Sequence, residues 1–135
     1  MKRLFLIGLF LGALCPSASF ALDTGSIILT GNLDASSPTG APPPNPTTFA
    51  TLNATTAFSA FANIRDSLNA QHTLNFYFFH TAPGSWTTEV FVDGGETIGG
   101  TAGLPQLVAL FTMGFTAGGN RIEPPANEGS IRAVW

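Results

Sequence analysis

Residues 65–80, RDSLNAQHTLNFYFFH, decide the fold, because a polar turn leads there into a strand with four consecutive aromatic side chains. Successive side chains of a strand point to opposite faces. Leu74, Phe76 and Phe78 therefore share one face, and the two remaining aromatic side chains lie on the other. Apolar groups on both faces predict a central strand with a covering layer on at least one side. An exposed aromatic platform for a ligand is the alternative interpretation.

Further strand-like runs follow the same pattern along the chain, and helix signals are almost absent. Thr, Val, Phe, Gly and Pro are frequent, and the apolar period changes every few residues. The predicted strands are residues 26–30, 55–65, 73–80, 86–92, 106–115 and 130–135. Residues 106–115 also fit a short helix, but the flanking Gly and Pro favour a strand. The pattern predicts an all-β fold, a small β-sandwich or barrel of roughly six to eight mostly antiparallel strands.

Turn-forming residues separate these runs. Residues 83–85 (PGS) and 117–120 (AGGN) are predicted as short connections. Residues 93–96 (DGGE) are predicted as a hairpin-type turn, since glycine adopts positive φ freely. Residues 36–46 hold five prolines. This segment is predicted as an extended linker or surface loop, because proline cannot donate a hydrogen bond to a sheet.

The N-terminal residues 1–21 predict a secretory signal peptide. Residues 1–3 are basic in two of three positions, and residues 4–14 form an uninterrupted apolar run. Ser19 and Ala21 place small residues at the two recognition positions before a cleavage site. The apolar run is too short for a stable membrane span.

Cleavage after Ala21 would leave residues 22–135 as one β-domain without a membrane span. Cys15 follows Leu14, where a lipoprotein signal needs a small residue, so lipidation is not expected. The loss of Cys15, the only cysteine, leaves a mature chain without a disulfide or a thiolate ligand. The expected location is the periplasm or the outside of the cell.

Charge limits the possible partners. Of five basic residues, Lys2 and Arg3 leave with the leader, so three arginines remain against eight acidic residues and the mature net charge is −5. Such a chain neutralises few phosphates, so neither nucleic acid nor an anionic membrane surface is an expected partner.

No set of residues predicts catalysis. His72 and His80, the only histidines, fall on one face of the same strand, roughly 26 Å apart at about 3.3 Å per residue. They cannot share a metal ion within that strand, and each is interpreted as a strand-end or turn residue. Glu89 and Asp93 are expected to be solvated. No Gly-x-Ser-x-Gly elbow, phosphate loop or calcium loop is present, so no enzyme, metal site or cofactor is expected.

Four segments together resemble the outer β-domain of the bacterial flagellar hook protein and of related rod proteins. They are LTGNLDASSP (29–38), residues 49–95, FTAGGNRIEPP (115–125) and SIRAVW (130–135). The similarity spans nearly all of the mature chain, and residues 66–68 with 72–74 are its most specific part. The matching positions are Gly31, Asn32, Leu33, Asp34, Asp66, Ser67, Leu68, His72, Thr73, Leu74, Trp86, Asp93, Gly94, Phe115, Gly119 and Asn120.

The resemblance implies a β-hairpin corner, without chemistry, at the start of the quoted stretch. Asp66 and Ser67 are expected to accept backbone N–H bonds there and so fold the chain. Asn69 stands where the family has glycine, and asparagine tolerates the left-handed conformation better than other residues.

Hook and rod subunits carry long terminal segments with heptad-like apolar spacing and have no cleaved leader. In this sequence a leader is expected at residues 1–21, and no heptad-like segment is found. The resemblance therefore implies a secreted, isolated structural domain that acts through surface contacts. The expected partner is a protein or a second copy bound through edge strands, such as the strand ending at Trp135. The alternative is a glycan or small-ligand binding module that uses exposed aromatic side chains such as Tyr77, Trp86 or Phe91.

Overall fold

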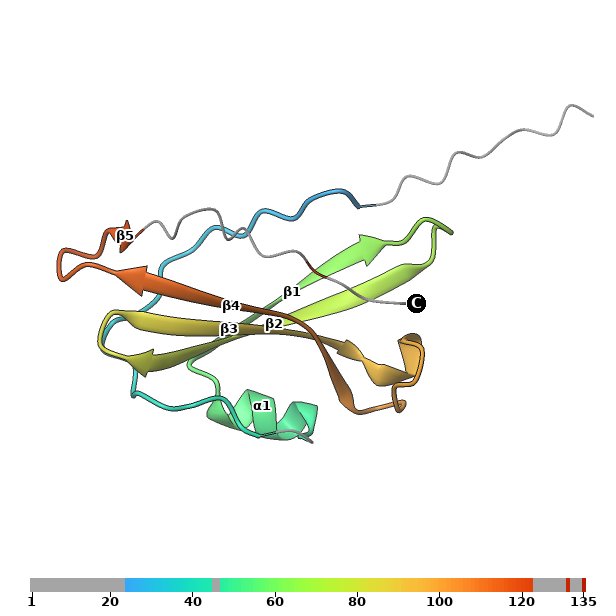
Figure 1. Ribbon diagram of the computed structural model, residues 1–135, viewed down its shortest axis with the longest axis horizontal. Coiled ribbons are helices and arrows are strands. Elements are labelled where there is room, and N and C mark those ends of the chain that lie inside the picture. The colour runs from blue at the N-terminus through green and yellow to red at the C-terminus, as the bar shows by residue number, and fades with distance from the viewer. Residues whose placement is uncertain (1–23, 45–46, 123–130, 132–134) are drawn as a thin grey trace, which may run out of the picture.

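The computed structural model describes residues 24–44, 47–122, 131 and 135. Its strands form one antiparallel sheet in the order β1-β2-β3-β4-β5 (Figure 1). The elements are α1 (Phe49–Thr55), β1 (Phe58–Arg65), β2 (Gln71–Ala82), β3 (Ser85–Asp93), the 3₁₀ helix η1 (Gly94–Glu96), β4 (Pro105–Phe115) and β5 (Arg121–Ile122). Each strand pairs with its sequence neighbour, so the sheet is a meander.

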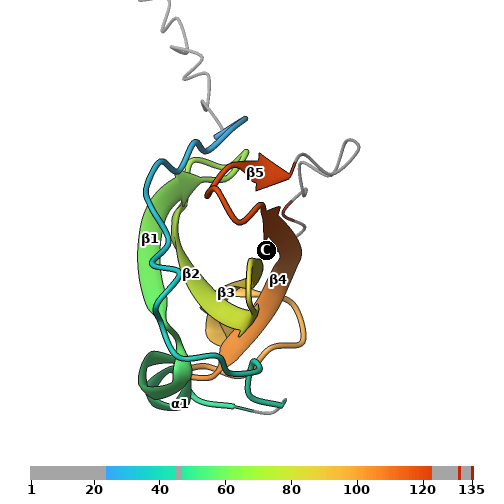
Figure 2. The same cartoon turned by 90° about the vertical axis from the view of Figure 1, so that its left-hand side faces the viewer.

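The prediction of a β fold is confirmed, but the predicted number of strands is not. The described residues form one open sheet of five strands, not six to eight, and neither a sandwich nor a closed barrel is confirmed. Residues 26–30 belong to no strand. The predicted strand at 130–135, except Ile131 and Trp135, and the predicted leader lie outside the described residues. Figure 2 shows the sheet curved into an open trough, with β1 in one wall and β4 in the other.

β2 is the central strand that its aromatic run predicted, since it pairs with β1 and β3 along most of its length. Its alternating side chains feed two separate cores. We call the first the Phe76 face; its buried members are Leu74, Phe76, Val90 and Val92. The second, the Tyr77 face, contains Leu52, Tyr77, Phe79 and Phe91. Both faces of the central strand are therefore covered.

The short helix α1 covers the Tyr77 face and was not predicted. Its seven residues, FATLNAT, are mostly weak helix formers. The side chain of Thr48 caps the helix by accepting a hydrogen bond from Thr51 N. Leu52, which is fully buried, packs on the aromatic side chains of the sheet. Tertiary burial, rather than propensity, thus stabilises α1, and the following strand begins at Phe58 instead of residue 55.

Distant segments of the chain cover the Phe76 face. Ile27, Ile131 and Trp135 pack against its buried residues. The N-terminal segment is tied to the sheet at Thr24, whose N–H donates to Arg65 O at 2.9 Å. A second tie is His80, whose Nδ1 donates to Ser37 O at 2.7 Å. Residues 36–44 carry neither helix nor strand.

The connections at 83–85 and 117–120 are tight turns, as predicted, with positive φ at Gly84 and Gly119. The prediction for residues 93–96 is wrong. Asp93 ends β3, and residues 94–96 form η1 at the start of the longer connection 94–104. Gly94 does not have positive φ; a Cβ there would lie 2.7 Å from the backbone N and O of Thr101. Close backbone approach, not turn conformation, requires glycine at this position.

Candidate functional site

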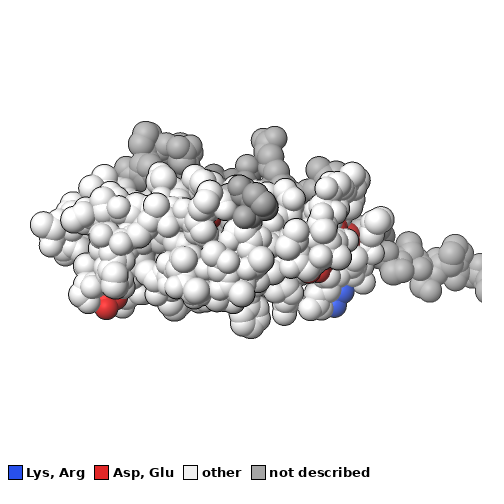
Figure 3. All heavy atoms as spheres, turned by 90° about the horizontal axis from the view of Figure 1, so that it is seen from below, with Lys and Arg blue, Asp and Glu red and all other residues white. Residues whose placement is uncertain are grey.

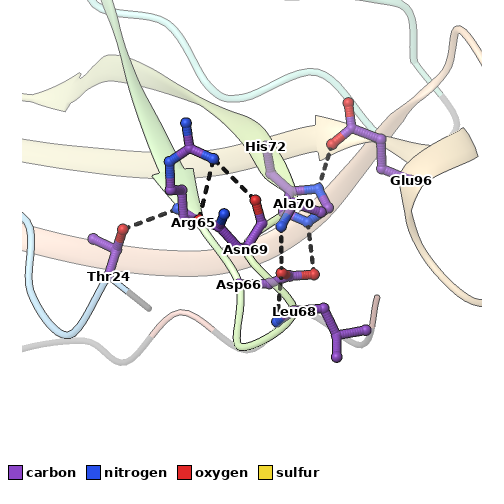
Figure 4. Close-up of polar contacts among 8 residues, drawn as sticks. All are labelled: Thr24, Arg65, Asp66, Leu68, Asn69, Ala70, His72 and Glu96. Carbon is purple, nitrogen blue, oxygen red and sulfur yellow. Dashed lines mark hydrogen bonds and ion pairs between the residues drawn. The ribbon is translucent and has the colours of Figure 1, made fainter. Parts of the chain in front are cut away.

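The corner between β1 and β2 is organised by Asp66 (Figure 4). Its Oδ1 accepts hydrogen bonds from Leu68 N at 2.9 Å and from Ala70 N at 2.8 Å. Asn69 adopts φ +66°, and Arg65 Nη1 donates to its backbone oxygen at 2.9 Å. The expected role of Asp66 and the left-handed Asn69 are confirmed.

Ser67 and Leu68 occupy the exposed tip of this corner. No hydrogen bond to the Ser67 side chain is found within the described residues, so the expected acceptor role of Ser67 is not seen there. Asp66 alone provides the carboxylate that folds the turn.

His72 lies at the start of β2 and is buried between two carboxylates. Its Nε2 is 3.2 Å from Asp66 Oδ2, and its Nδ1 is 2.8 Å from Glu96 Oε2. The ring of Trp135 stacks on it with centroids 3.6 Å apart. His72 is therefore at a strand end, as interpreted, but it joins the corner to η1 and to Trp135. The sequence gives no signal for this, because Glu96 is 24 positions away.

Both ring nitrogens of His72 face a carboxylate, so only the doubly protonated ring donates to both. The two carboxylates lie against opposite sides of the ring and do not converge on one ion. Among the residues that the structure describes, no group of three His, Cys, Asp or Glu side chains is arranged to bind a metal. The cluster Asp66–His72–Glu96 is thus a structural side-chain network that joins the corner to η1.

The pKa of Asp66 is lowered. Desolvation by burial acts to raise this pKa, but hydrogen bonds from Ala70 N, His72 and Leu68 N together outweigh it. Asp66 therefore stays ionised to lower pH than an ordinary aspartate, which keeps its hydrogen bonds at the corner intact in mild acid.

The aromatic side chains proposed for ligand binding are buried. Tyr77, Trp86 and Phe91 are only 4%, 3% and 1% exposed. Tyr77 and Phe91 pack in the core that α1 covers, and Trp86 stacks on His80 with centroids 4.7 Å apart. Their burial contradicts the alternative of a ligand-binding module that uses Tyr77, Trp86 or Phe91 as exposed aromatic side chains.

Glu89 and Asp93 are not simply solvated. Partial burial raises the pKa of Glu89 on β3. Asp93 Oδ1 accepts hydrogen bonds from Gly95 N at 2.7 Å and from Gly103 N at 3.0 Å, so it closes the connection between β3 and β4. Asp93 is therefore a structural carboxylate.

The other motif residues lie in turns, core and surface. Asn32 is exposed and Leu33 is half-buried in the N-terminal segment. The side chain of Thr73 donates to Asn63 Oδ1 across β1 and β2 at 3.0 Å, and Leu74 is fully buried. Asn120 closes the turn after β4 together with Gly119: its N–H donates to Thr116 Oγ1 at 3.2 Å. None of these positions forms a catalytic arrangement with another.

An open groove of about 380 Å³ lies on the Tyr77 face and was not predicted. Residues of α1, β1, β2 and η1, together with Asp93, line it: Phe49, Asn53, Ser59, Ala60, Phe61, Thr73, Asn75, Tyr77, Asp93 and Glu96. Phe61 is 69% exposed and contributes an accessible aromatic ring. The available signal was weak: Ser59 and Phe61, two positions apart on β1, share the face that lines the groove.

No helix within the described ranges is long and apolar enough to cross a membrane. In the comparisons with known proteins, no curated protein and no solved structure matches the chain. A family model, described as the flagellar basal body protein FlaE D2 domain, matches residues 32–131. The match includes β1 to β5, the corner at Asp66 and the buried His72. The chain therefore belongs to the family of this flagellar D2 domain, a structural family of the bacterial flagellum.

Proposed function

We propose that the chain is a secreted, non-enzymatic structural domain that acts through surface contacts with other protein chains. Family membership supports a role in flagellar architecture. The observation that carries the proposal is the open sheet, in which each outer long strand has an edge that the described residues leave largely unpaired.

Among the residues that the structure describes, the outer edge of β4 is unpaired over most of its length. β5 pairs only with Gly114 and Phe115, and no other segment of the described chain pairs with Pro105–Met113. The eleven residues of β4 include no charged side chain. Charged residues are a common device against edge-to-edge pairing, so their absence leaves β4 suited to accept another strand.

The outer edge of β1 is similar. Within the described residues, only Thr24 contacts this edge by hydrogen bonds, at Arg65, the last residue of the strand. The exposed rings of Phe58 and Phe61 lie on the same strand. Two open edges on one antiparallel sheet permit head-to-tail association, which continues from copy to copy.

The two histidines support a role without catalysis. Both nitrogens of His72 face carboxylates, and His80 Nδ1 donates to a backbone carbonyl. His80 Nε2 is buried. Neither ring is therefore free to act as a general base toward a bound substrate.

Sedimentation velocity of residues 22–135 over a wide concentration range tests the edge contact. The wild type should associate as its concentration rises. Leu110→Lys, which places a charge on the β4 edge, should shift the onset of association to at least about tenfold higher concentration. Leu68→Lys is the matched control, because Leu68 is also exposed but lies at the hairpin corner.

Monomeric wild-type protein at the highest concentrations, or equal effects of the two lysine substitutions, would refute self-association through β4. Association with a different subunit would then be tested by the same pair of variants in a mixture with that subunit.

Export is proposed from the leader pattern of residues 1–21. Mass spectrometry of the protein recovered from the periplasm or medium should give an N-terminus at Leu22. Full-length protein retained in the cytoplasm would contradict this part of the proposal.

A further inference from the structure

The groove on the Tyr77 face combines an accessible aromatic ring with polar groups on fixed elements. Cross-strand pairing places Phe61 opposite Asn75, and Ser59 opposite Tyr77. Asn53 reaches the same groove from α1. Its volume of about 380 Å³ falls at the lower end of the range of about 300–1,000 Å³ typical of binding sites. The groove therefore suits one side chain of a partner with a short piece of its backbone.

The two charged side chains that line the groove are both acidic. Asp93 and Glu96 line it, and no lysine or arginine does. Seen from the α1 side, the surface is mostly uncharged, with isolated acidic atoms and one small basic area (Figure 3). An anionic ligand would meet only repulsion here, whereas a cationic group would be attracted.

Glu96 is held in position rather than left to move freely. Its Oε2 bonds to His72 Nδ1 at 2.8 Å, and His72 is itself fixed by Asp66 and by the stacked ring of Trp135. A carboxylate that is already ordered loses less conformational entropy when it binds a partner group.

Phe61 supplies the second recognition element. Its ring is largely exposed on β1, although the neighbouring aromatic side chains Phe49 and Tyr77 are partly or fully buried. A planar cation stacks on such a ring, and guanidinium does so more readily than ammonium. Guanidinium also matches the geometry of a carboxylate.

We propose that this groove binds an arginine side chain of a protein partner, with its guanidinium stacked on Phe61 and hydrogen-bonded to Glu96. The side-chain oxygens of Asn53 and Asn75 offer further acceptors. We assign the partner to a different chain, because residues 22–135 contain only three arginines and Arg65 is already bonded to Asn69 at the corner. This inference rests on the proposed role in protein contacts, but it uses a different surface from the β4 edge.

The test is an NMR titration of ¹⁵N-labelled residues 22–135 with the peptide acetyl-Gly-Arg-Gly-amide. The matched control peptide replaces arginine by citrulline, which has nearly the same shape and no charge. Arginine peptide should shift the amide signals of groove residues, and citrulline peptide should bind about tenfold more weakly, as expected for a charge-assisted hydrogen bond.

Two substitutions test the assigned contacts separately. Phe61→Ala removes the stacking ring and leaves the His72 cluster intact, and Glu96→Gln removes the carboxylate charge. Each should weaken binding about five- to tenfold. Glu89→Gln, on the same face but outside the groove, should leave the affinity unchanged.

Three results would overturn the assignment: no shifts at peptide concentrations of tens of millimolar, shifts outside the groove, or equal binding of the citrulline peptide. Equal binding would identify the groove as a site for neutral ligands. Loss of peptide binding would not change the self-association through the β4 edge that sedimentation velocity measures. The two proposals can therefore fail independently.

Discussion

The two faces of β2 are covered in different ways. On the Tyr77 face, a seven-residue helix close to β1 in sequence places one leucine over three aromatic side chains. On the Phe76 face, residues from both distant ends of the described chain supply the cover. The first cover is local and leaves a groove beside it. The second ties the sheet to Thr24, Ser37 and Trp135.

This difference assigns distinct tasks to the two faces. The Phe76 face secures the chain ends and holds the His72 cluster, so it is the structural side. The Tyr77 face combines a firm aromatic core under α1 with exposed polar and aromatic groups on β1. Contacts with other molecules are therefore expected on the Tyr77 face and along the free edges of the sheet.

The largest effect is expected from Phe79→Ala in the core under α1. The side chain is fully buried, and deletion of such a ring costs about 3–5 kcal/mol in the free energy of unfolding. Phe61→Ala, on the same face but exposed, is the control and should change stability by less than about 0.5 kcal/mol. Urea unfolding of both variants measures the difference; equal losses would contradict the assignment of this core.

A somewhat smaller loss, about 2–4 kcal/mol, is expected for Leu52→Ala, which removes the buried side chain of α1. Because the helix cover is local, hydrogen exchange should accelerate at Tyr77 and Phe79 more than at Leu74. Uniform acceleration over the whole sheet would show that the two faces do not behave separately.

Trp135→Ala tests the cover formed by distant residues. Loss of the ring stacked on His72 should cost about 1 kcal/mol and should shift the NMR signals of His72 and Glu96. Conservative Trp135→Phe should restore most of the stability. An unchanged His72 signal in Trp135→Ala would argue against the stacking contact.

The pH dependence of stability is the subtlest test. The pKa of Asp66 is lower in the folded state than its usual value of 3.8. Ionised Asp66 therefore contributes fully to the free energy of unfolding above pH 3.8. The contribution is lost as pH falls through the lower, folded pKa. Urea midpoints should therefore fall more steeply below about pH 4 in the wild type than in Asp66→Asn. Glu89 should have the opposite effect, because burial raises its pKa and its ionisation therefore lowers the free energy of unfolding as pH rises. Glu89→Gln should remove this loss of stability.

The central strand and the corner were predictable because their signals are local. Four consecutive aromatics indicated two covered faces, and Asp66 with Asn69 indicated a tight turn. The helix α1 was missed because Leu52 is stabilised by aromatic residues of other elements, not by neighbours in the helix. Gly94 was misinterpreted because the backbone that crowds it comes from Thr101, in a folded connection.

The candidate site was less predictable than the fold. Burial of Tyr77, Trp86 and Phe91 depends on which elements cover each face of the sheet. The alternation of side chains along a strand does not show which elements these are. Glu96 and His72 are 24 positions apart and meet only through the β2–β3 pairing. The exposed ring of Phe61 is visible as a residue type in the sequence, but its accessibility depends on which elements cover β1.

The most direct test of a structural domain with an open β4 edge is amide hydrogen exchange of residues 22–135 at low and high protein concentration. Slow exchange is expected in β2 and β3 under both conditions. In β4, the outward amides within Pro105–Met113 should exchange rapidly when dilute and become protected when concentrated. Equally strong protection of those amides at every concentration would contradict an edge that is free to receive another chain.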